Sequence, residues 1–517
     1  ALARIRKLEH DCAEYAKLVA LLQEANERLQ RGLTGHKAER FAPGDSQMSL
    51  AILQLALQGG ATEESPATSP DAETQTVAEH ERRKPVRKPL PDHLPRVAIE
   101  FLPEHVKREG LDAFERIGAD TREVIERRPA SAVVVQLIYP KFVRKDRARN
   151  EATEVLVAPT VEMPIERGLA GPTLLADTIV RRWADHQPLS RQEGILAREG
   201  LDLAKSTLCG WHETLAELAA PLLATMFVDA LSCPYLCVDA TGVLVQAPER
   251  CKVGHFWVMV APDKHVLYRF SARHDAKAVD GLLAGYSGYL VADAHAVYDH
   301  LYRDGAITEV ACWSHGRRYW FKALESDPDR AKLALSLIGE LFRIERTIAD
   351  APRKKREAVR STRSKPVVQK FFEWCESQRD EVLDESPVAT AIRYALNQRA
   401  ALSRFLDDGR LPAHNNLSEL NLRRQVLGRR NWLFLGSEDG AQANTTFVSL
   451  LASARLHDIE PLGYIRDILC LLPSWPRHRV LALAPAYWKK TLEEPETQQK
   501  LDANVFRRVT LGLPPLV

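Results

Sequence analysis

The sequence lacks the features that mark several common classes of protein. None of its apolar runs approaches the ~18 residues of a membrane-spanning helix, and its first residues show no hydrophobic signal-peptide core. An excess of one charge is absent too, because 71 Lys and Arg residues stand against 69 Asp and Glu residues. We therefore expect no membrane partner, and any nucleic-acid surface must come from local clusters of charge.

Cysteine is scarce and scattered. The eight cysteines never form a Cys-x-x-Cys pair, which is typical of reduced thiols and predicts a cytoplasmic protein. Structural zinc needs about four thiolate or imidazole ligands at short spacings, whereas 97–168 contains no cysteine and a single histidine, His105. No structural zinc is therefore expected. The sequence also lacks a Walker loop, a nucleophile elbow, a His-Glu-x-x-His motif and a dinucleotide fingerprint.

The N-terminal region divides into a helix and a linker. In 1–36, apolar residues recur at spacings of three and four, with Asn26 on the same seam. This pattern predicts a coiled-coil helix that makes the protein a homodimer or higher oligomer; the alternative is an amphipathic helix packed on its own chain. The stretch 37–95 contains runs of Gly, Ser and Pro and a basic run, 82–88, which predicts a partly disordered basic linker.

A small β-rich domain is predicted to follow the linker. Valine-rich runs in 96–168 are typical of strands. The stability of an apolar core in about 70 residues is marginal without a disulfide or a bound metal ion. We therefore expect this domain to depend on packing against the neighbouring helical domain or a partner subunit. Its expected core residues are Val124, Ile125, Val134, Leu137 and Ile138.

The segment 169–228 is predicted to be a helical, helix-turn-helix-like domain. Ser190 to Arg198 predicts one helix, the Glu199-Gly200 pair ends it, and Ser206 is expected to cap a second. Two short helices about such a turn are compatible with DNA binding, with Lys205 and Ser206 as contacts. Helix pairs of this size also occur in any α-rich protein.

Strands and helices alternate beyond this domain. In 229–316, three strands are followed by a helix, a strand, a helix and a strand, which is the order of a ribonuclease-H-like mixed sheet in an α/β protein. A large all-helical insertion is predicted over 317–410. The α/β core is expected to be completed over 411–460, and 461–517 forms a C-terminal tail to which the sequence assigns no chemistry.

Two of these apolar strands end in a carboxylate, Asp239 and Asp293. A single Asp in this position commonly caps the next helix or turn. If the two strands are adjacent in one sheet, however, their carboxylates converge at one edge, where two like charges need a cation. Oxygen ligands without a thiolate or imidazole pair favour Mg²⁺ or Mn²⁺. A third carboxylate from a nearby helix would complete a site for two ions, which suits phosphodiester chemistry.

Seven short blocks carry a more specific pattern. They are Trp183-Ala184-Asp185-His186-Gln187-Pro188, Ser206-Thr207-Leu208, Asp239-Ala240-Thr241, Ala292-Asp293-Ala294-His295, Cys312-Trp313-Ser314-His315, Asn415-Asn416-Leu417-Ser418-Glu419 and Leu427-Gly428-Arg429-Arg430-Asn431-Trp432. Taken in order, these blocks resemble those of the insertion-sequence 66 (IS66) family of transposases. The resemblance covers most of the chain.

The resemblance implies a DDE transposase with a ribonuclease-H-like fold. It implies that Asp239, Asp293 and Glu419 are the catalytic residues and the ligands of two Mg²⁺ or Mn²⁺ ions. The implied reaction is hydrolysis at transposon ends, followed by attack of the freed 3′-hydroxyl on target DNA. DNA is then the main partner, with accessory proteins as a further class, and the helical insertion lies between Asp293 and Glu419.

Further motif residues are expected near this active site. Cys312 and His315 have a spacing that allows metal binding, but with no second pair in sight a structural or substrate-orienting role is predicted. Asn415 and Asn416 belong to the same surroundings. Four arginines follow Glu419 and are expected to contact DNA phosphates, the alternative being a solvated helix face. These are Arg423, Arg424, Arg429 and Arg430.

Three features depart from the pattern of the family. Its members usually carry a cysteine zinc motif before the helical segment, but no cysteine occurs between Cys12 and Cys209. Ala240 and His414 stand where many members have an acidic residue. Two alternatives therefore stay open, namely a ribonuclease-H-like metal-dependent nuclease without strand transfer and a catalytically decayed DNA-binding protein.

Overall fold

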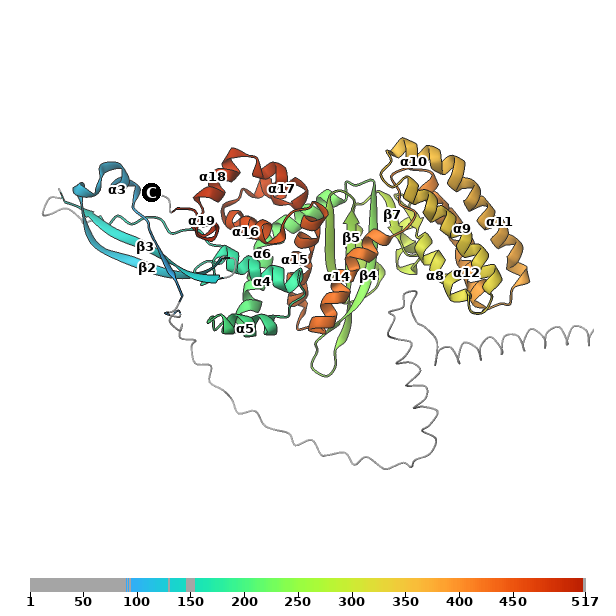
Figure 1. Ribbon diagram of the computed structural model, residues 1–517, viewed down its shortest axis with the longest axis horizontal. Coiled ribbons are helices and arrows are strands. Elements are labelled where there is room, and N and C mark those ends of the chain that lie inside the picture. The colour runs from blue at the N-terminus through green and yellow to red at the C-terminus, as the bar shows by residue number, and fades with distance from the viewer. Residues whose placement is uncertain (1–89, 91, 93, 129–130, 146–153, 515–517) are drawn as a thin grey trace, which may run out of the picture. The chain divides into compact units, whose positions relative to one another are not determined.

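The computed structural model describes residues 90, 92, 94–128, 131–145 and 154–514 (Figure 1). The predicted coiled coil over 1–36 and nearly all of the predicted linker lie outside these residues. The described chain divides into two units. The smaller unit contains 316–343 and 366–397, and the larger one contains the remaining described residues.

The larger unit begins with a three-stranded sheet. Its strands are β1 (Arg96–Glu100), β2 (Phe114–Arg128) and β3 (Ser131–Arg144), in the order β1-β3-β2. β1 and β3 are parallel, and β2 and β3 are antiparallel. The chain passes from β1 to β2 through α3 (Glu104–Glu109) and the 3₁₀ helix η1 (Leu111–Ala113). The sequence predicted several short strands in this region, but the structure has mainly two long ones, β2 and β3.

The core of this sheet is completed by the last helix, α19 (Val505–Leu511). Val124 and Leu137 cluster with Val505, Phe506 and Val509 from that helix. Of the five predicted core residues, all except the partly exposed Ile138 are at most 2% exposed. The core of this sheet is therefore completed by packing against a C-terminal segment to which no role was assigned from the sequence.

Three helices follow the sheet, namely α4 (Pro172–Trp183), α5 (Leu189–Arg198) and α6 (Lys205–Ala230). The chain turns after α5 at Gly200, whose φ is 83°. The prediction that Ser206 caps the second helix is wrong, because α6 already begins at Lys205 and its N-cap is Ala204. Instead, Glu193 accepts the Lys205 N–H at 2.9 Å and so satisfies one of the free N–H groups of the first turn.

A mixed sheet forms the centre of the larger unit. Five strands lie in the order β6-β5-β4-β7-β8, and the two-residue β9 (Phe434–Leu435) pairs with β4. β4 (Tyr235–Val245), β5 (Lys252–Ala261) and β6 (His265–Ser271) are antiparallel, whereas β4, β7 (Gly288–Ala292) and β8 (Ile307–Ala311) are parallel. This arrangement is consistent with the predicted ribonuclease-H-like core.

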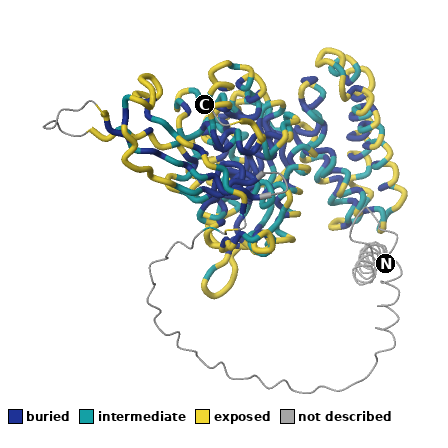
Figure 2. Tube along the Cα trace, turned by 60° about the vertical axis from the view of Figure 1, so that its left-hand side comes forward, coloured by how far each residue is buried: buried dark blue, intermediate teal, exposed yellow. Residues whose placement is uncertain are grey.

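Helices cover both faces of the mixed sheet. α14 (Asn416–Trp432) and α15 (Glu438–Leu456) pack on one face, where the Tyr268 hydroxyl donates to Asn421 O at 2.8 Å. On the other face Tyr298, from the 3₁₀ helix η2 (Ala296–Tyr302), meets Trp257 edge to face. The second helix predicted for this region is thus η2, and the first is α7 (Ala276–Leu283). Figure 2 shows buried residues concentrated in the interior and exposed residues along the outer loops.

The rest of the described chain is helical. The predicted insertion, 317–410, begins within α8 (Trp313–Ala323) and contains α9 (Pro328–Thr347), α10 (Arg353–Val359), α11 (Lys365–Gln378), α12 (Pro387–Asn397) and α13 (Arg399–Ser403), joined by short helical turns. The C-terminal region contains α16 (Pro461–Leu471), α17 (Pro485–Leu492) and α18 (Pro495–Ala503) before α19. Each of α16, α17 and α18 begins with a proline, a position where the backbone N–H would have no partner within the helix and its absence costs nothing. No helix in the described ranges is long and apolar enough to cross a membrane.

Candidate active site

Asp239 lies on β4, and Asp293 directly follows the neighbouring strand β7. β4 and β7 are parallel, and their register pairs Cys237 with Val291. Asp239 lies two residues later within β4, which continues to Val245, whereas Asp293 is the first residue after the end of β7. Continuing the register by two residues puts Asp293 opposite Asp239. Because alternate residues of a strand share a face, we infer that both carboxylates lie toward the same face of the sheet. Both residues are partly exposed.

Glu419 comes to the same face from the first turn of α14. Asp239 pairs with Val258 on β5, and Val258 pairs with Tyr268 on β6, so these three side chains share one face. The hydrogen bond from Tyr268 to Asn421 O holds α14 against that face. The structure thus brings the helix that carries Glu419 onto the side of the sheet that carries the two aspartates.

The asparagine pair fixes the start of this helix. Asn415 is fully buried, and its side-chain amide donates to Val238 O at 2.9 Å, one residue before Asp239. Its backbone N–H donates to Cys312 Sγ at 3.1 Å. Asn416 accepts a hydrogen bond from the Ser314 hydroxyl at 3.1 Å. The start of α14 is therefore tied both to β4 and to the residues that follow β8.

The electrostatics of this edge suit a divalent cation. Tyr298 is buried beside it, and the pKa of its phenol is raised well above the ordinary value, first by burial and then by the charges of Asp293 and Asp239. Both carboxylates act on one side chain, so their negative charges lie in the same neighbourhood. Carboxylate oxygens are ligands that Mg²⁺ and Mn²⁺ prefer, and the two aspartates fit such an ion.

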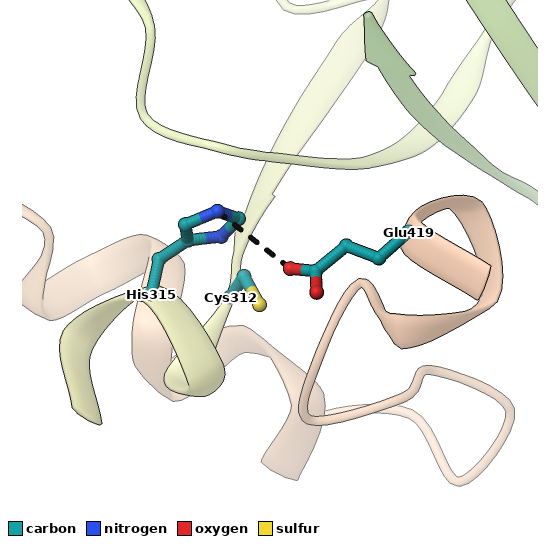
Figure 3. Close-up of side chains that lie close together, drawn as sticks. All are labelled: Cys312, His315 and Glu419. Atoms are coloured by element: carbon teal, nitrogen blue, oxygen red, sulfur yellow. Dashed lines mark ion pairs between the residues drawn. The ribbon is translucent and has the colours of Figure 1, made fainter. Parts of the chain in front are cut away.

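The Glu419 carboxylate faces a second group of donor atoms (Figure 3). His315 Nε2 lies 3.6 Å from Glu419 Oε1, and the ligand atoms of Cys312, His315 and Glu419 all lie within 4.8 Å of one another. Among the described residues, no other three Cys, His, Asp or Glu side chains come this close. Cys312 and His315 thus gain a third partner, which sequence spacing could not supply because it lies more than a hundred positions further on.

Cys312 is enclosed by backbone donors. It is 0% exposed and directly precedes α8. Burial raises the pKa of its thiol, while N–H groups of Asn415, His315 and Ser314 that point at the sulfur oppose that shift. The thiol therefore sits in a pocket of positive backbone dipoles at the start of a helix.

A group of flat rings close to Asp293 was not predicted from the sequence. Trp257 stacks on His274 with ring centroids 4.8 Å apart, and His274 also packs against His295 at 4.7 Å and His255 at 4.9 Å. The pKa of His274 is lowered first by burial and then by the other two histidines, with Asp293 opposing. The available signal was His255 and Trp257, two positions apart in an otherwise apolar strand.

The predicted DNA contacts at the start of α6 and on α14 differ in exposure. Lys205 and Ser206 are exposed, as are Arg423 and Arg430. Arg424 is partly buried, and burial lowers the pKa of its guanidinium. The structure therefore leaves four of the six predicted contacts open to a ligand.

Arg429 has structural partners instead. Its guanidinium donates to Thr241 Oγ1 at 3.0 Å and also to Gly242 O, which joins α14 to β4 beyond Asp239. Ala240, one of the departures from the family pattern, pairs with Trp257 on β5 and so belongs to the sheet face opposite Asp239. An acidic residue there would point away from the two aspartates. His414 is partly buried, and burial lowers the pKa of its imidazole.

Comparison with known proteins agrees with the resemblance read from the motifs. A family model described as Transposase IS66 family matches residues 167–443, and one described as Transposase C of IS166 homeodomain matches residues 21–99. Two relatives from Sinorhizobium fredii (strain NBRC 101917 / NGR234) are both described as uncharacterized. Protein y4hP is 30% identical over 498 residues, covering 91% of this chain and 89% of the relative. Protein y4qI is 30% identical over 521 residues, covering 93% of each.

The first family model spans more than half of the chain and contains Asp239, Asp293 and Glu419. Its range also includes the mixed sheet and the whole helical insertion. This chain belongs to the IS66 family of transposases.

Proposed function

We propose that this protein is an active DDE transposase that cleaves transposon ends and joins the freed 3′-hydroxyls to target DNA. Asp239, Asp293 and Glu419 are its catalytic residues in this proposal. The observation that carries it is the register of the parallel strands β4 and β7, because continuing it by two residues brings Asp293, just beyond β7, opposite Asp239 on β4. The placement of Glu419 in the first turn of α14, on the same face, supports the third assignment.

The carboxylates would hold Mg²⁺ or Mn²⁺. Two such ions, when bound, activate the attacking hydroxyl and stabilise the leaving oxygen of a phosphodiester. The protein's part is to hold the ligands still. The Ala240 N–H donates to Asp239 Oδ1 at 2.8 Å and orients that carboxylate, and the buried Asn415 amide fixes α14 relative to the end of β4.

Positive charge near the site would position the DNA. Arg423 and Arg430 are exposed on the helix that carries Glu419, where guanidinium groups contact phosphates without regard to sequence. The rings of His274 and His295 offer flat surfaces close to Asp293, and bases stack on such surfaces irrespective of sequence. Lys205 and Ser206 supply a separate exposed surface at the start of α6.

The test is cleavage of DNA that carries the element's own ends, in the presence of Mg²⁺. Asp239→Ala, Asp293→Ala and Glu419→Ala should each abolish cleavage and leave end binding largely intact, because cation ligands and not DNA contacts are removed. Asp304→Ala is the matched control, since Asp304 is exposed in the turn before β8. More than trace cleavage by the Asp293→Ala protein would contradict the assignment.

Joining distinguishes a transposase from a nuclease. The same reaction with a supercoiled target plasmid should yield strand-transfer products in which the end DNA is covalently linked to the target. Cleavage without such products would support the ribonuclease-H-like nuclease. DNA binding without metal-dependent cleavage by the unaltered protein would support the decayed DNA-binding protein.

A further inference from the structure

Three side chains with different donor atoms meet beyond the end of β8. Cys312 follows that strand, His315 lies in the first turn of α8, and Glu419 lies in the first turn of α14. Their ligand atoms come from segments far apart in the sequence and all lie within 4.8 Å of one another (Figure 3). The donors are one sulfur, one imidazole nitrogen and one carboxylate oxygen.

The spacing of these atoms is close to that of a zinc site. Zinc bonds of about 2.0–2.2 Å to nitrogen and oxygen and about 2.3 Å to sulfur put tetrahedral ligand atoms roughly 3.3–3.7 Å apart. The separation of 3.6 Å between His315 Nε2 and Glu419 Oε1 already meets that requirement. Because no separation exceeds 4.8 Å, the sulfur needs to approach by no more than about 1 Å.

The surroundings of the donors suit a cation of the zinc class. A thiolate and an imidazole favour zinc over Mg²⁺ or Ca²⁺, which prefer oxygen ligands. The backbone N–H of Asn415 donates to Cys312 Sγ at 3.1 Å, the kind of outer bond that orients a metal ligand. Cys312 is fully buried, whereas the side chains of His315 and Glu419 are 18% and 25% exposed, which leaves an ion a way in.

We propose that Cys312, His315 and Glu419 form a binding site for a zinc-class cation, with the fourth position open, and that its occupation withdraws Glu419 from Asp239 and Asp293. The Glu419 carboxylate cannot coordinate a cation together with Cys312 and His315 while it coordinates another together with Asp239 and Asp293. Cation binding at Cys312 stands without the proposed function, but its inhibitory consequence rests on that function. Because coupling between two sites is reciprocal, zinc should weaken Mn²⁺ binding at the aspartates by the factor by which Mn²⁺ weakens zinc.

Cobalt tests the binding directly, because Co²⁺ replaces zinc and absorbs in the near ultraviolet when a thiolate coordinates it. Titration of the full-length protein with Co²⁺, without Mg²⁺, should give a thiolate-to-cobalt band that saturates at one ion per chain. Cys312→Ser should remove the band, and His315→Gln should weaken binding by about tenfold or more. Cys251→Ser, at an exposed cysteine between β4 and β5, is the control and should keep the band. A band that persists in Cys312→Ser, or no band in the unaltered protein, would overturn the site.

Competition for Glu419 is tested by Mn²⁺ binding, followed by electron paramagnetic resonance. Preloading with one Zn²⁺ per chain should weaken Mn²⁺ binding and slow cleavage of end DNA in the unaltered protein, but not in Cys312→Ser or in His315→Gln. The second variant decides the matter if the buried Cys312→Ser protein does not fold. Equal weakening in the variants would overturn the competition. Failure of the unaltered protein to cleave without zinc would count against the proposed function alone, because the cobalt and Mn²⁺ measurements would still decide the site.

Discussion

The two sheets of the larger unit place carboxylates in opposite situations. On the three-stranded sheet, Glu126 is 0% exposed and accepts N–H bonds from Arg127 at 2.7 Å, Leu174 at 2.9 Å and Thr173 at 3.3 Å. Two of these donors belong to the first turn of α4, so Glu126 serves to hold a helix. On the mixed sheet, Asp239 and Asp293 share a partly exposed edge.

This difference shows how a strand carboxylate is assigned to structure or to chemistry. A carboxylate that is buried and surrounded by backbone donors has its hydrogen-bonding capacity used within the fold. A pair of carboxylates at matching positions of an open edge is left with charge that a cation can neutralise. A single strand-end Asp cannot be assigned from the sequence alone, and it is the register of two strands that distinguishes the cases.

The largest effect is expected from the core of the three-stranded sheet. Phe506→Ala should lower the free energy of unfolding of that sheet by about 3–5 kcal/mol, because it removes a fully buried ring from α19. Hydrogen exchange in β2 and β3, alongside chemical unfolding, would measure it. The control is Leu511→Ala in the same helix, where the side chain is 46% exposed and the change should stay within about 0.5 kcal/mol. Unaltered exchange in Phe506→Ala would show that the sheet is stable without α19.

The buried carboxylate should make stability depend on pH. Burial raises the pKa of Glu126 to about 8, although N–H groups of Arg127, Leu174 and Thr173 oppose the shift. Because the folded pKa lies above the unfolded one, this contribution is fully present below about pH 4.5 and is lost as pH rises toward 8. Between pH 6 and pH 8 the free energy of unfolding should fall by about 2 kcal/mol. Urea unfolding of the Glu126→Gln protein should not show this fall in the free energy of unfolding. An identical fall in the variant and the unaltered protein would contradict the assignment to Glu126.

At the edge that carries Asp239 and Asp293, removing a carboxylate charge should stabilise the fold in the absence of cations. In Asp293→Asn without divalent ions, the loss of one of two like charges should stabilise the fold by up to about 1 kcal/mol. Added Mg²⁺ should raise the melting temperature of the unaltered protein, because a ligand of the folded state stabilises it, but not that of the variant. Thermal melts with and without Mg²⁺ measure both effects. Equal responses to Mg²⁺ would remove Asp293 from the cation site.

The smallest effect concerns arginines on a single helix, α14. Replacing the exposed Arg423 and Arg430 by Ala should weaken binding about equally for all DNA sequences and flatten its salt dependence by up to ~0.9 log units for each phosphate that is no longer neutralised. Arg429→Ala is the contrast, because Arg429 donates to Thr241 and Gly242 and its removal should lower stability. Titrations at several salt concentrations measure the slope, and an unchanged slope in the double variant would place both residues on a solvated face.

The sequence predicted the parts of the fold that depend on local pattern. The strands that lead to Asp239 and Asp293 follow from short apolar runs, and the convergence of the two residues follows from the parallel direction of those strands. The prediction that the first strand ends at Asp239 is wrong, because β4 continues to Val245. The N-cap of α6 was misplaced by two residues, at Ser206 and not at Ala204, because propensity favours serine as a cap, whereas tertiary structure supplies Glu193 instead.

Contacts between distant segments could not be predicted. Val505, Phe506 and Val509 lie on a short helix, and nothing in their spacing names the three-stranded sheet as a partner. The meeting of Cys312 with Glu419 depends on how α14 enters the core through Asn415, which is a tertiary contact. Both findings concern residues more than a hundred positions apart.

The most direct test of the central claim is a change of cation preference at Asp293. Asp293→Cys replaces a hard oxygen ligand by a softer sulfur, which favours Mn²⁺ or Cd²⁺ over Mg²⁺. Cleavage of end DNA by this variant should be abolished in Mg²⁺ and restored in part by the softer ions. Cleavage in Mg²⁺ at the rate of the unaltered protein would contradict the claim that Asp293 holds the catalytic cation.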